Sequence, residues 1–197
     1  MKYLKGWKMI LSRVRGPTTA ARLAAEMENR YYELLPTYAH ITAKPLRDQL
    51  ENLILPGLAL YQTLLADMEG DRSAALAEAE GFFYAEFFTI ERRFIPLLRI
   101  LPDPFPILRP ALRQMCRNTY LPGASEVVED SQDCFAVNTY QCFILDTLTH
   151  AGAPELTPLY CKTDDWLAAL LPNARWLRSS TLALGADCCN FRWCRGR

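Results

Sequence analysis

Six of the chain's seven cysteines lie in its last third, and thiols are its strongest candidates for chemistry. Cys188 and Cys189 stand side by side in the stretch STLALGADCCNFRWC. Four interpretations are open for them: a structural metal site, a disulfide, a catalytic thiol or a buried strand. Side chains alternate between the two faces of a strand, so Cys189 shares a face with Phe191 and Trp193 while Cys188 points away. The two thiols therefore do not easily act as a pair, and Cys189 is the inward candidate.

A second thiol stands near a carboxylate. Cys161 precedes Asp164 by three residues in YCKTDD, where Thr163 or Asp164 is a natural N-cap for a helix through DWLAALL. A helix N-terminus lowers a thiol pKa, and a nearby carboxylate can orient water or shuttle a proton. The alternative is that Asp164 only caps the helix and Cys161 packs beneath it. Cys142, at the end of a predicted strand, has the same two interpretations, and Cys189 has the alternative of a small buried hydrophobe.

The two histidines are weaker candidates. His150 is expected at the end of a helix, beside the negative end of its dipole, with a Cys–His catalytic arrangement as the alternative. His40 lies in the loop PTYAHITAKP, from which it could reach a pocket. No cysteine spacing is CxxC, so neither a zinc ribbon nor a thioredoxin-like motif is predicted.

The composition is that of a soluble globular protein, with 50% hydrophobic and 22% charged residues among 197. Lys and Arg number 22, as do Asp and Glu, so net charge provides no general attraction to nucleic acid or to an anionic membrane. The apolar run near the N-terminus is too short for a signal peptide, and no segment is long enough for a membrane span. We therefore expect a cytoplasmic chain without a membrane span or a nucleic-acid partner. In that compartment a disulfide framework is not expected.

Helical periodicity dominates the first part of the chain. One helix is predicted through residues 20–35 with Thr18 as its cap, and another from about residue 46 to 68 with a kink or break at Pro56. A third helix is predicted to begin near Ala74 and to carry an aromatic stripe that packs in the core.

The pattern changes after residue 130. Residues 134–142 predict a strand, residues 143–152 a short helix, and the tail two strands joined by a turn at residues 185–187. The predicted class is α+β, with a helical N-terminal part packed on a small antiparallel sheet that carries short helices. Residues 1–197 are expected to form a single domain, with a helical subregion at 1–120 and an α+β subregion at 130–197.

The run C…HAGAPEL…YCKTD…RSSTLALGADCCNFRW resembles the 2-aminothiazoline-4-carboxylate hydrolase family. The matching positions are Cys142, Gly152, Pro154, Glu155, Leu156, Cys161, Asp164, Thr181, Leu182, Gly185, Asp187, Cys189 and Phe191. The helical half also looks like the family's. Two positions depart from its pattern: Ala186 replaces a second glycine, and Gln141 stands where an arginine often precedes Cys142. The missing arginine bears on how a substrate carboxylate would be bound.

The resemblance implies hydrolysis of a small cyclic amidine, such as 2-amino-thiazoline-4-carboxylate, to an N-carbamoyl amino acid. The catalytic candidates are Cys161 and Asp164, with Cys142 and Cys189 completing a thiol-lined pocket. Cys161 could attack directly, or a carboxylate or metal could activate water. No cofactor is required, and a single metal ion held by these four residues is an open alternative.

A second hypothesis belongs to another class of protein. The C-terminal part also resembles vinyl-reductase-like ligand-binding modules, which predicts a non-catalytic sensor that binds a small molecule or a metal. A plain α+β domain with a cysteine-rich core is the third interpretation. The expected partner is a small-molecule substrate, and assembly into a homo-oligomer is left open.

Overall fold

The structure is a computed structural model that describes residues 3–119 and 123–196. The chain divides into two compact units. Unit 1 comprises Met1–Phe87 and Ala151–Leu159, and unit 2 comprises Phe88–His150 and Tyr160–Arg197. A single domain over residues 1–197, with subregions at 1–120 and 130–197, stays a prediction.

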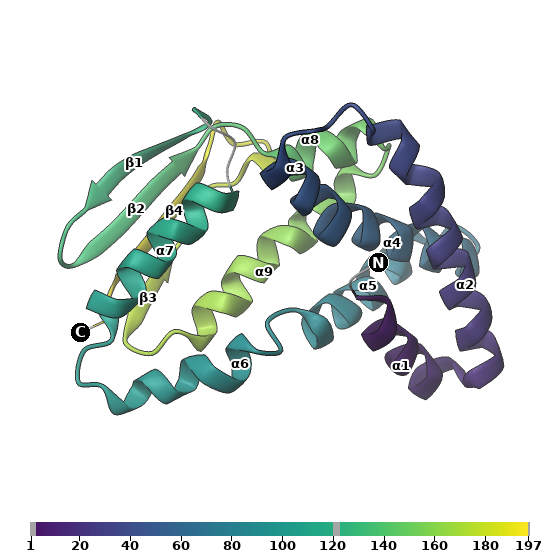
Figure 1. The fold of residues 1–197 in the computed structure, drawn as a ribbon, viewed down its shortest axis with the longest axis horizontal. Coiled ribbons are helices and arrows are strands. Elements are labelled where there is room, and N and C mark those ends of the chain that lie inside the picture. Colours follow the sequence, from purple (N-terminus) through teal and green to yellow (C-terminus); the bar gives the residue numbers. More distant parts are fainter. Residues whose placement is uncertain (1–2, 120–122, 197) are drawn as a thin grey trace. The chain divides into compact units, whose positions relative to one another are not determined.

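Unit 1 is helical (Figure 1). Its elements are α1 (Leu4–Arg15), α2 (Pro17–Leu34), the 3₁₀ turn η1 (Leu35–Tyr38), α3 (Lys44–Gln49), the π-helical η2 (Leu50–Ile54), α4 (Leu55–Asp67), α5 (Arg72–Glu86) and the 3₁₀ turn η4 (Pro154–Leu156). Every residue from 55 to 61 is buried, so the first half of α4 has no exposed face. A helix that is apolar all round belongs in the centre of a core, and α4 contacts both α2 and α5.

One local expectation for unit 1 is wrong, and another is met in a different form. Thr18 does not cap α2, because the helix already begins at Pro17, whose fixed φ and missing N–H suit a first helical position. The predicted interruption near Pro56 is present as the π-helical turn η2, which lies directly before α4. Such a turn absorbs a local mismatch in the hydrogen-bond ladder.

The third predicted helix is shorter than its aromatic pattern suggests. It is α5, which Asp71 caps by accepting a hydrogen bond from the Ala74 N–H at 3.0 Å. The helix ends at Glu86, so Phe83 and Phe87 are buried in unit 1 whereas Phe94 is exposed. The predicted stripe also included Ile90, which is exposed too, so the prediction that the whole stripe packs in the core is wrong at Ile90 and Phe94.

Unit 2 contains a four-stranded antiparallel sheet in the order β1-β2-β4-β3 among the described residues. The strands are β1 (Ser125–Asp130), β2 (Cys134–Thr139), β3 (Ala174–Leu177) and β4 (Cys189–Arg195). The helical elements are α6 (Glu91–Phe94), the 3₁₀ segment η3 (Ile95–Ile100), α7 (Phe105–Thr119), α8 (Phe143–His150), α9 (Thr157–Leu170), whose first residues belong to unit 1, and the 3₁₀ turn η5 (Leu182–Leu184).

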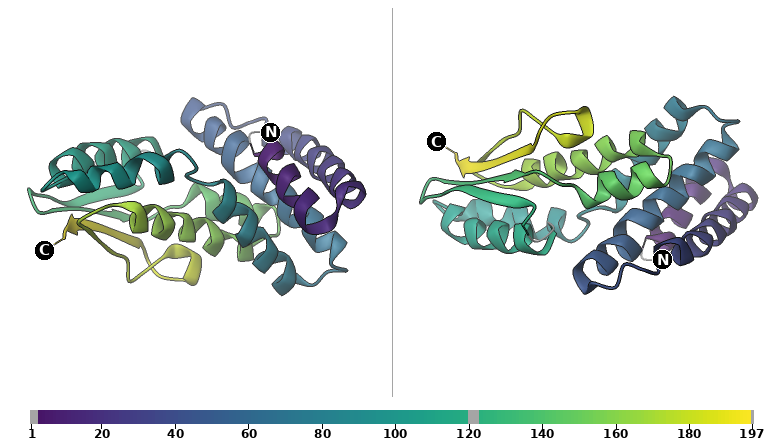
Figure 2. Two further views of the ribbon diagram at one scale, coloured as in Figure 1. Left: turned by 90° about the horizontal axis from the view of Figure 1, so that it is seen from below. Right: turned by 90° about the horizontal axis from the view of Figure 1, so that it is seen from above.

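One face of this sheet forms the core of unit 2. Figure 2 shows α7 along one side of the sheet, and the cluster of buried residues joins Leu108 and Leu112 of α7 to Phe135, Phe191 and Trp193 of the strands. Along β4 the buried positions alternate with half-buried ones, as a sheet with one covered face requires.

Strand alternation separates the two adjacent cysteines as predicted. Cys189 is buried on the same face as Phe191 and Trp193, whereas Cys188 is only half-buried. The predicted α+β class is confirmed by the helices and the small antiparallel sheet. None of the described helices has the length and apolar character that a membrane crossing needs.

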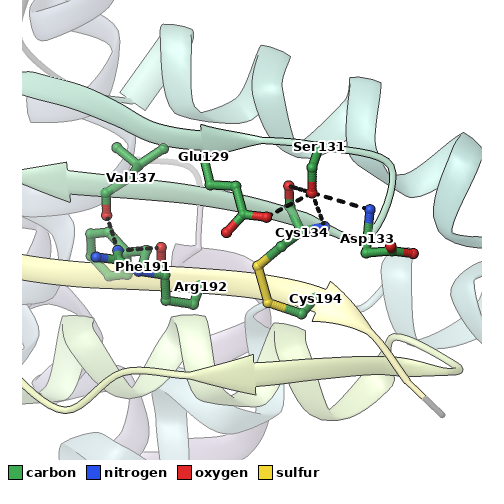
Figure 3. The surroundings of a disulfide bond; sticks show 8 residues. All are labelled: Glu129, Ser131, Asp133, Cys134, Val137, Phe191, Arg192 and Cys194. Atoms are coloured by element: carbon green, nitrogen blue, oxygen red, sulfur yellow. Dashed lines mark hydrogen bonds between the residues drawn. A yellow bond between two sulfur atoms is a disulfide. The ribbon is translucent and has the colours of Figure 1, made fainter.

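A disulfide joins β2 to β4, contrary to the expectation for the cysteines. Cys134 and Cys194 are directly opposed in the register and their Cα atoms lie 4.0 Å apart (Figure 3). Next to them the Arg195 N–H donates to the Asp133 carbonyl at 2.7 Å, so the two cysteines occupy a non-hydrogen-bonded pair, where side chains come closest. The β1–β2 turn is fixed by Ser131 Oγ, which accepts the Cys134 N–H at 3.0 Å.

Candidate functional site

Helix α9 places Cys161 and Asp164 on one face. The helix begins at Thr157, so both residues lie inside it rather than at its mouth. Residues three apart are neighbours on a helix surface, which puts the thiol and the carboxyl on the same stripe. The prediction that Thr163 or Asp164 caps this helix is wrong, and with it the expectation that a helix N-terminus lowers the pKa of Cys161.

The hydroxyl of Thr181 connects Cys161 with Cys189. Thr181 Oγ1 lies 3.5 Å from Cys161 Sγ and 3.5 Å from Cys189 Sγ. Thr181 precedes η5, and its oxygen also accepts the Ala183 N–H at 3.3 Å, which fixes its rotamer. Cys189 Sγ in turn accepts the Leu182 N–H at 3.3 Å. The loop after β3 therefore places one hydroxyl between a thiol of α9 and a thiol at the start of β4.

Cys142 is the third thiol of this group. It lies directly before α8, and its Sγ accepts the Leu145 N–H at 3.5 Å, as an N-cap side chain does. Burial raises the pKa of Cys142 to about 11, and the neighbouring Cys161 and Cys189 contribute in the same direction. The predicted strand through Cys142 is wrong at its end, since β2 stops at Thr139.

Arg178 links the carboxyl to the backbone of Cys161. Its Nη1 donates to the Cys161 carbonyl at 2.9 Å and lies 3.4 Å from Asp164 Oδ2, while its Nη2 contacts Asp165 Oδ2 at 2.7 Å. The guanidinium carbon also lies 5.7 Å from the ring centroid of Trp176, whose indole N–H donates to Asp165 Oδ1 at 2.8 Å. Figure 1 shows α9 beside β3, the pair of elements that this network joins.

Burial keeps Asp164 and Cys161 protonated to unusually high pH. It raises the pKa of Asp164 to about 7; the Arg178 charge opposes this shift, and Asp165 adds to it. About a third of the Asp164 side chain (34%) is exposed, so water screens part of these effects. Burial also raises the pKa of Cys161, against the lowering effects of the Thr181 hydrogen bond and Arg178. At neutral pH Cys161 is therefore a thiol, next to a carboxyl that can gain or lose a proton.

This arrangement suits proton transfer more than metal binding. A carboxyl with a pKa near the working pH is an effective general acid and base, and a neighbouring thiol is the group whose proton it can take. Among residues 3–119 and 123–196, no three His, Cys, Asp or Glu side chains are arranged to hold a metal ion. The alternative of a metal on Cys142, Cys161, Asp164 and Cys189 thus has no support in the geometry.

The histidines belong to other parts of the fold. His40 is in unit 1, where its ring packs against Tyr38 with the centroids 6.5 Å apart. His150 ends α8, the helix that Cys142 precedes, so the two residues are separated by about 12 Å of helix axis. Two open hollows of unit 1, of about 460 and 290 Å³, contain none of the predicted site residues.

Sequence reasoning missed the groups that connect the site. Arg178 and Asp165 had no assigned role, and Thr181 was only a position in the resemblance. Their meeting depends on β3 returning alongside α9, which no local pattern in the sequence encodes. The one available signal was the pair of acidic residues Asp164 and Asp165 on a helix, followed by an arginine just after a strand.

The cysteines of the candidate site lie in a region that matches a known protein family. Residues 104–193 match the sequence profile of the L-2-amino-thiazoline-4-carboxylic acid hydrolase family. The resemblance to that family is confirmed. The match spans slightly less than half of the chain, lies almost wholly in unit 2 and includes Cys142, Cys161, Asp164 and Cys189. A hydrolase-like family is thereby supported for this part of the chain.

The other comparisons add little. No curated protein matches the sequence. Among solved structures, the crystal structure of an Fe(II) unliganded H-NOX protein from K. algicida aligns over 100% of this chain and 97% of that chain, with a TM-score of 0.35 and 15% sequence identity. A likeness at this level carries no statement about fold or function.

Proposed function

We propose that the protein is a hydrolase that opens a small cyclic amidine, such as 2-amino-thiazoline-4-carboxylate, to an N-carbamoyl amino acid. The observation that carries the proposal is the meeting of Cys161, Asp164 and Cys189 around Thr181 and Arg178, inside the region that matches the hydrolase family. In this proposal Cys142 and Cys189 line the pocket and Cys161 and Asp164 perform the chemistry.

The first step is attack of Cys161 on the amidine carbon C2. Asp164 takes the thiol proton as the Sγ–C2 bond forms, and then gives that proton to the ring sulfur as the C2–S bond breaks. Water next adds to C2 and gives one proton to the former ring nitrogen; Asp164 takes the other proton and passes it to Sγ as the Sγ–C2 bond breaks. Cys161 is released as a thiol, and the substrate carbon becomes the carbonyl of the N-carbamoyl product. A carboxyl with a pKa of about 7 is suited to both directions of proton transfer.

The direct test combines product analysis with a matched cysteine control. Purified protein is incubated with 2-amino-thiazoline-4-carboxylate, and mass spectrometry follows the N-carbamoyl product and any adduct on Cys161. We expect Cys161→Ser and Asp164→Asn to lower kcat/KM by about 10²–10⁴-fold, the usual contribution of such groups. Cys188→Ser, which alters the half-buried neighbour of Cys189, should leave kcat/KM unchanged.

Two results separate the alternatives. Product without an adduct, in a Cys161→Ser variant that stays active, would assign the reaction to water activated by Asp164. Ligand binding without turnover in the wild type would favour the non-catalytic sensor, which the raised thiol pKa values of Cys142 and Cys161 also suit, because protonated thiols are poor nucleophiles. A cytoplasmic location and a homo-oligomer stay predictions.

A further inference from the structure

We propose that Arg178 is the positioning residue of this site, holding Cys161 and Asp164 together and supplying the positive charge that their reactive forms need. The inference rests on the proposed roles of those two residues. Nothing in the resemblance assigns a role to Arg178, which lies one residue after the end of β3.

The position of the guanidinium is set from several sides. One nitrogen, Nη1, serves both the Cys161 carbonyl at 2.9 Å and the Asp164 carboxylate at 3.4 Å. The other, Nη2, is held by Asp165 at 2.7 Å, and the Trp176 ring lies 5.7 Å from the guanidinium carbon. The Arg178 side chain is only 12% exposed, so these contacts rather than solvent determine its orientation.

The carbonyl contact fixes helix α9 at the reactive thiol. A carbonyl inside a helix already accepts a hydrogen bond from within the helix, and its second lone pair is free for an outside donor. Because Arg178 donates to the backbone carbonyl of Cys161, it links the helix at this residue to the end of β3. A group fixed in this way keeps the near-attack geometry that thiol chemistry requires.

The charge balance gives Arg178 a second effect. One guanidinium faces two carboxyls, Asp164 and Asp165, so it cannot neutralise both when both are ionised. The same charge favours the thiolate of Cys161. Removing it should therefore raise the pKa of the Cys161 thiol and of the Asp164 carboxyl together, although both are already raised by burial.

The test reads the reactivity of each cysteine without requiring turnover. The full-length protein is treated with isotope-coded iodoacetamide from pH 6 to 11, and peptide mass spectrometry gives a separate rate for Cys161 and for Cys188. The variants are Arg178→Gln, which removes the charge, Arg178→Lys, which keeps it, and Arg175→Gln, which changes an exposed arginine of β3.

We expect Arg178→Gln to move the pH midpoint of Cys161 alkylation upward and to slow the reaction at pH 7.5 about tenfold, as loss of a nearby opposite charge does. Arg178→Lys should restore most of the rate, and Arg175→Gln should match the wild type. Cys188 should react alike in all four proteins. If Arg178 served the fold alone, its loss would expose Cys161, and alkylation would become faster with a lower midpoint.

A faster or unchanged Cys161 in Arg178→Gln would overturn the inference, as would an equal effect of Arg175→Gln. The outcome is independent of the proposed function, because thiol reactivity is measurable even if no cyclic amidine is hydrolysed. If the alkylation midpoint shifts as expected but no substrate is turned over, the proposed role of Arg178 stands and the proposed hydrolase function fails.

Discussion

Removing the disulfide between Cys134 and Cys194 is predicted to lower the free energy of unfolding of unit 2 by about 4 kcal/mol. The two residues are 60 positions apart in the sequence. Closing a loop of that length restricts the unfolded chain by an entropy worth about 4 kcal/mol at 25 °C in the chain-entropy account. The disulfide also joins β2 to β4, the central strand pair of the sheet, so the effect should concentrate there.

Hydrogen exchange in the double variant Cys134→Ser/Cys194→Ser measures this effect unit by unit. The slowest amides of β2 and β4 should lose about a thousandfold of protection, which is the rate equivalent of about 4 kcal/mol. Amides of α4, in unit 1, report whether the loss is local. Cys188→Ser, a single change just before β4, should leave protection as in the wild type. A loss below about 1 kcal/mol would refute the reasoning, because the cross-link would then contribute no entropy of the expected size.

Three further predictions follow from buried ionisable groups. Cys142 should alkylate with a midpoint near pH 11 and hardly at all at pH 8, because its pKa is raised to about 11; rapid labelling at pH 8 would contradict its burial. The stability of the wild type should fall as pH rises from about 4 to 7, because native Asp164 still holds a proton that the unfolded chain has released. Asp164→Asn should flatten that decline in urea titrations at several pH values, and an unchanged slope would assign it to another group. Tyr61→Phe should lower the free energy of unfolding by about 1.5–3 kcal/mol, because it removes the hydroxyl that donates to Glu155 Oε1 at 2.8 Å. An unchanged free energy of unfolding would show that this hydrogen bond does not stabilise the fold.

The sequence was sufficient for features that depend on local periodicity. A period of two places Cys189 and Phe191 on the covered face, and the structure buries both. Helical spacing in the first part and β-forming residues in the last part predict α+β, which the described elements confirm. Cys161 of α9 and Cys189 of β4 lie on either side of the Thr181 hydroxyl. A shared catalytic site of these thiols with Cys142 stays a prediction.

The errors arose where two local signals competed or where distant segments pair. Asp164 is a good cap, yet the helix begins earlier at Thr157, where Pro158 provides a stronger start signal. That earlier start puts Cys161 inside the helix and removes the expected effect of a helix N-terminus. The Cys134–Cys194 disulfide depends on the β2–β4 register, and pairing across that separation cannot be read from spacing alone.

The most direct test of the proposed function is turnover of 2-amino-thiazoline-4-carboxylate by the wild type and by Cys161→Ser, with intact-protein mass spectrometry in the same reactions. The account predicts an N-carbamoyl product, a transient adduct on Cys161 of the wild type, and loss of both in the variant. A wild type that is folded, with Cys161 reduced, and that yields no product from this or any related cyclic amidine would contradict it.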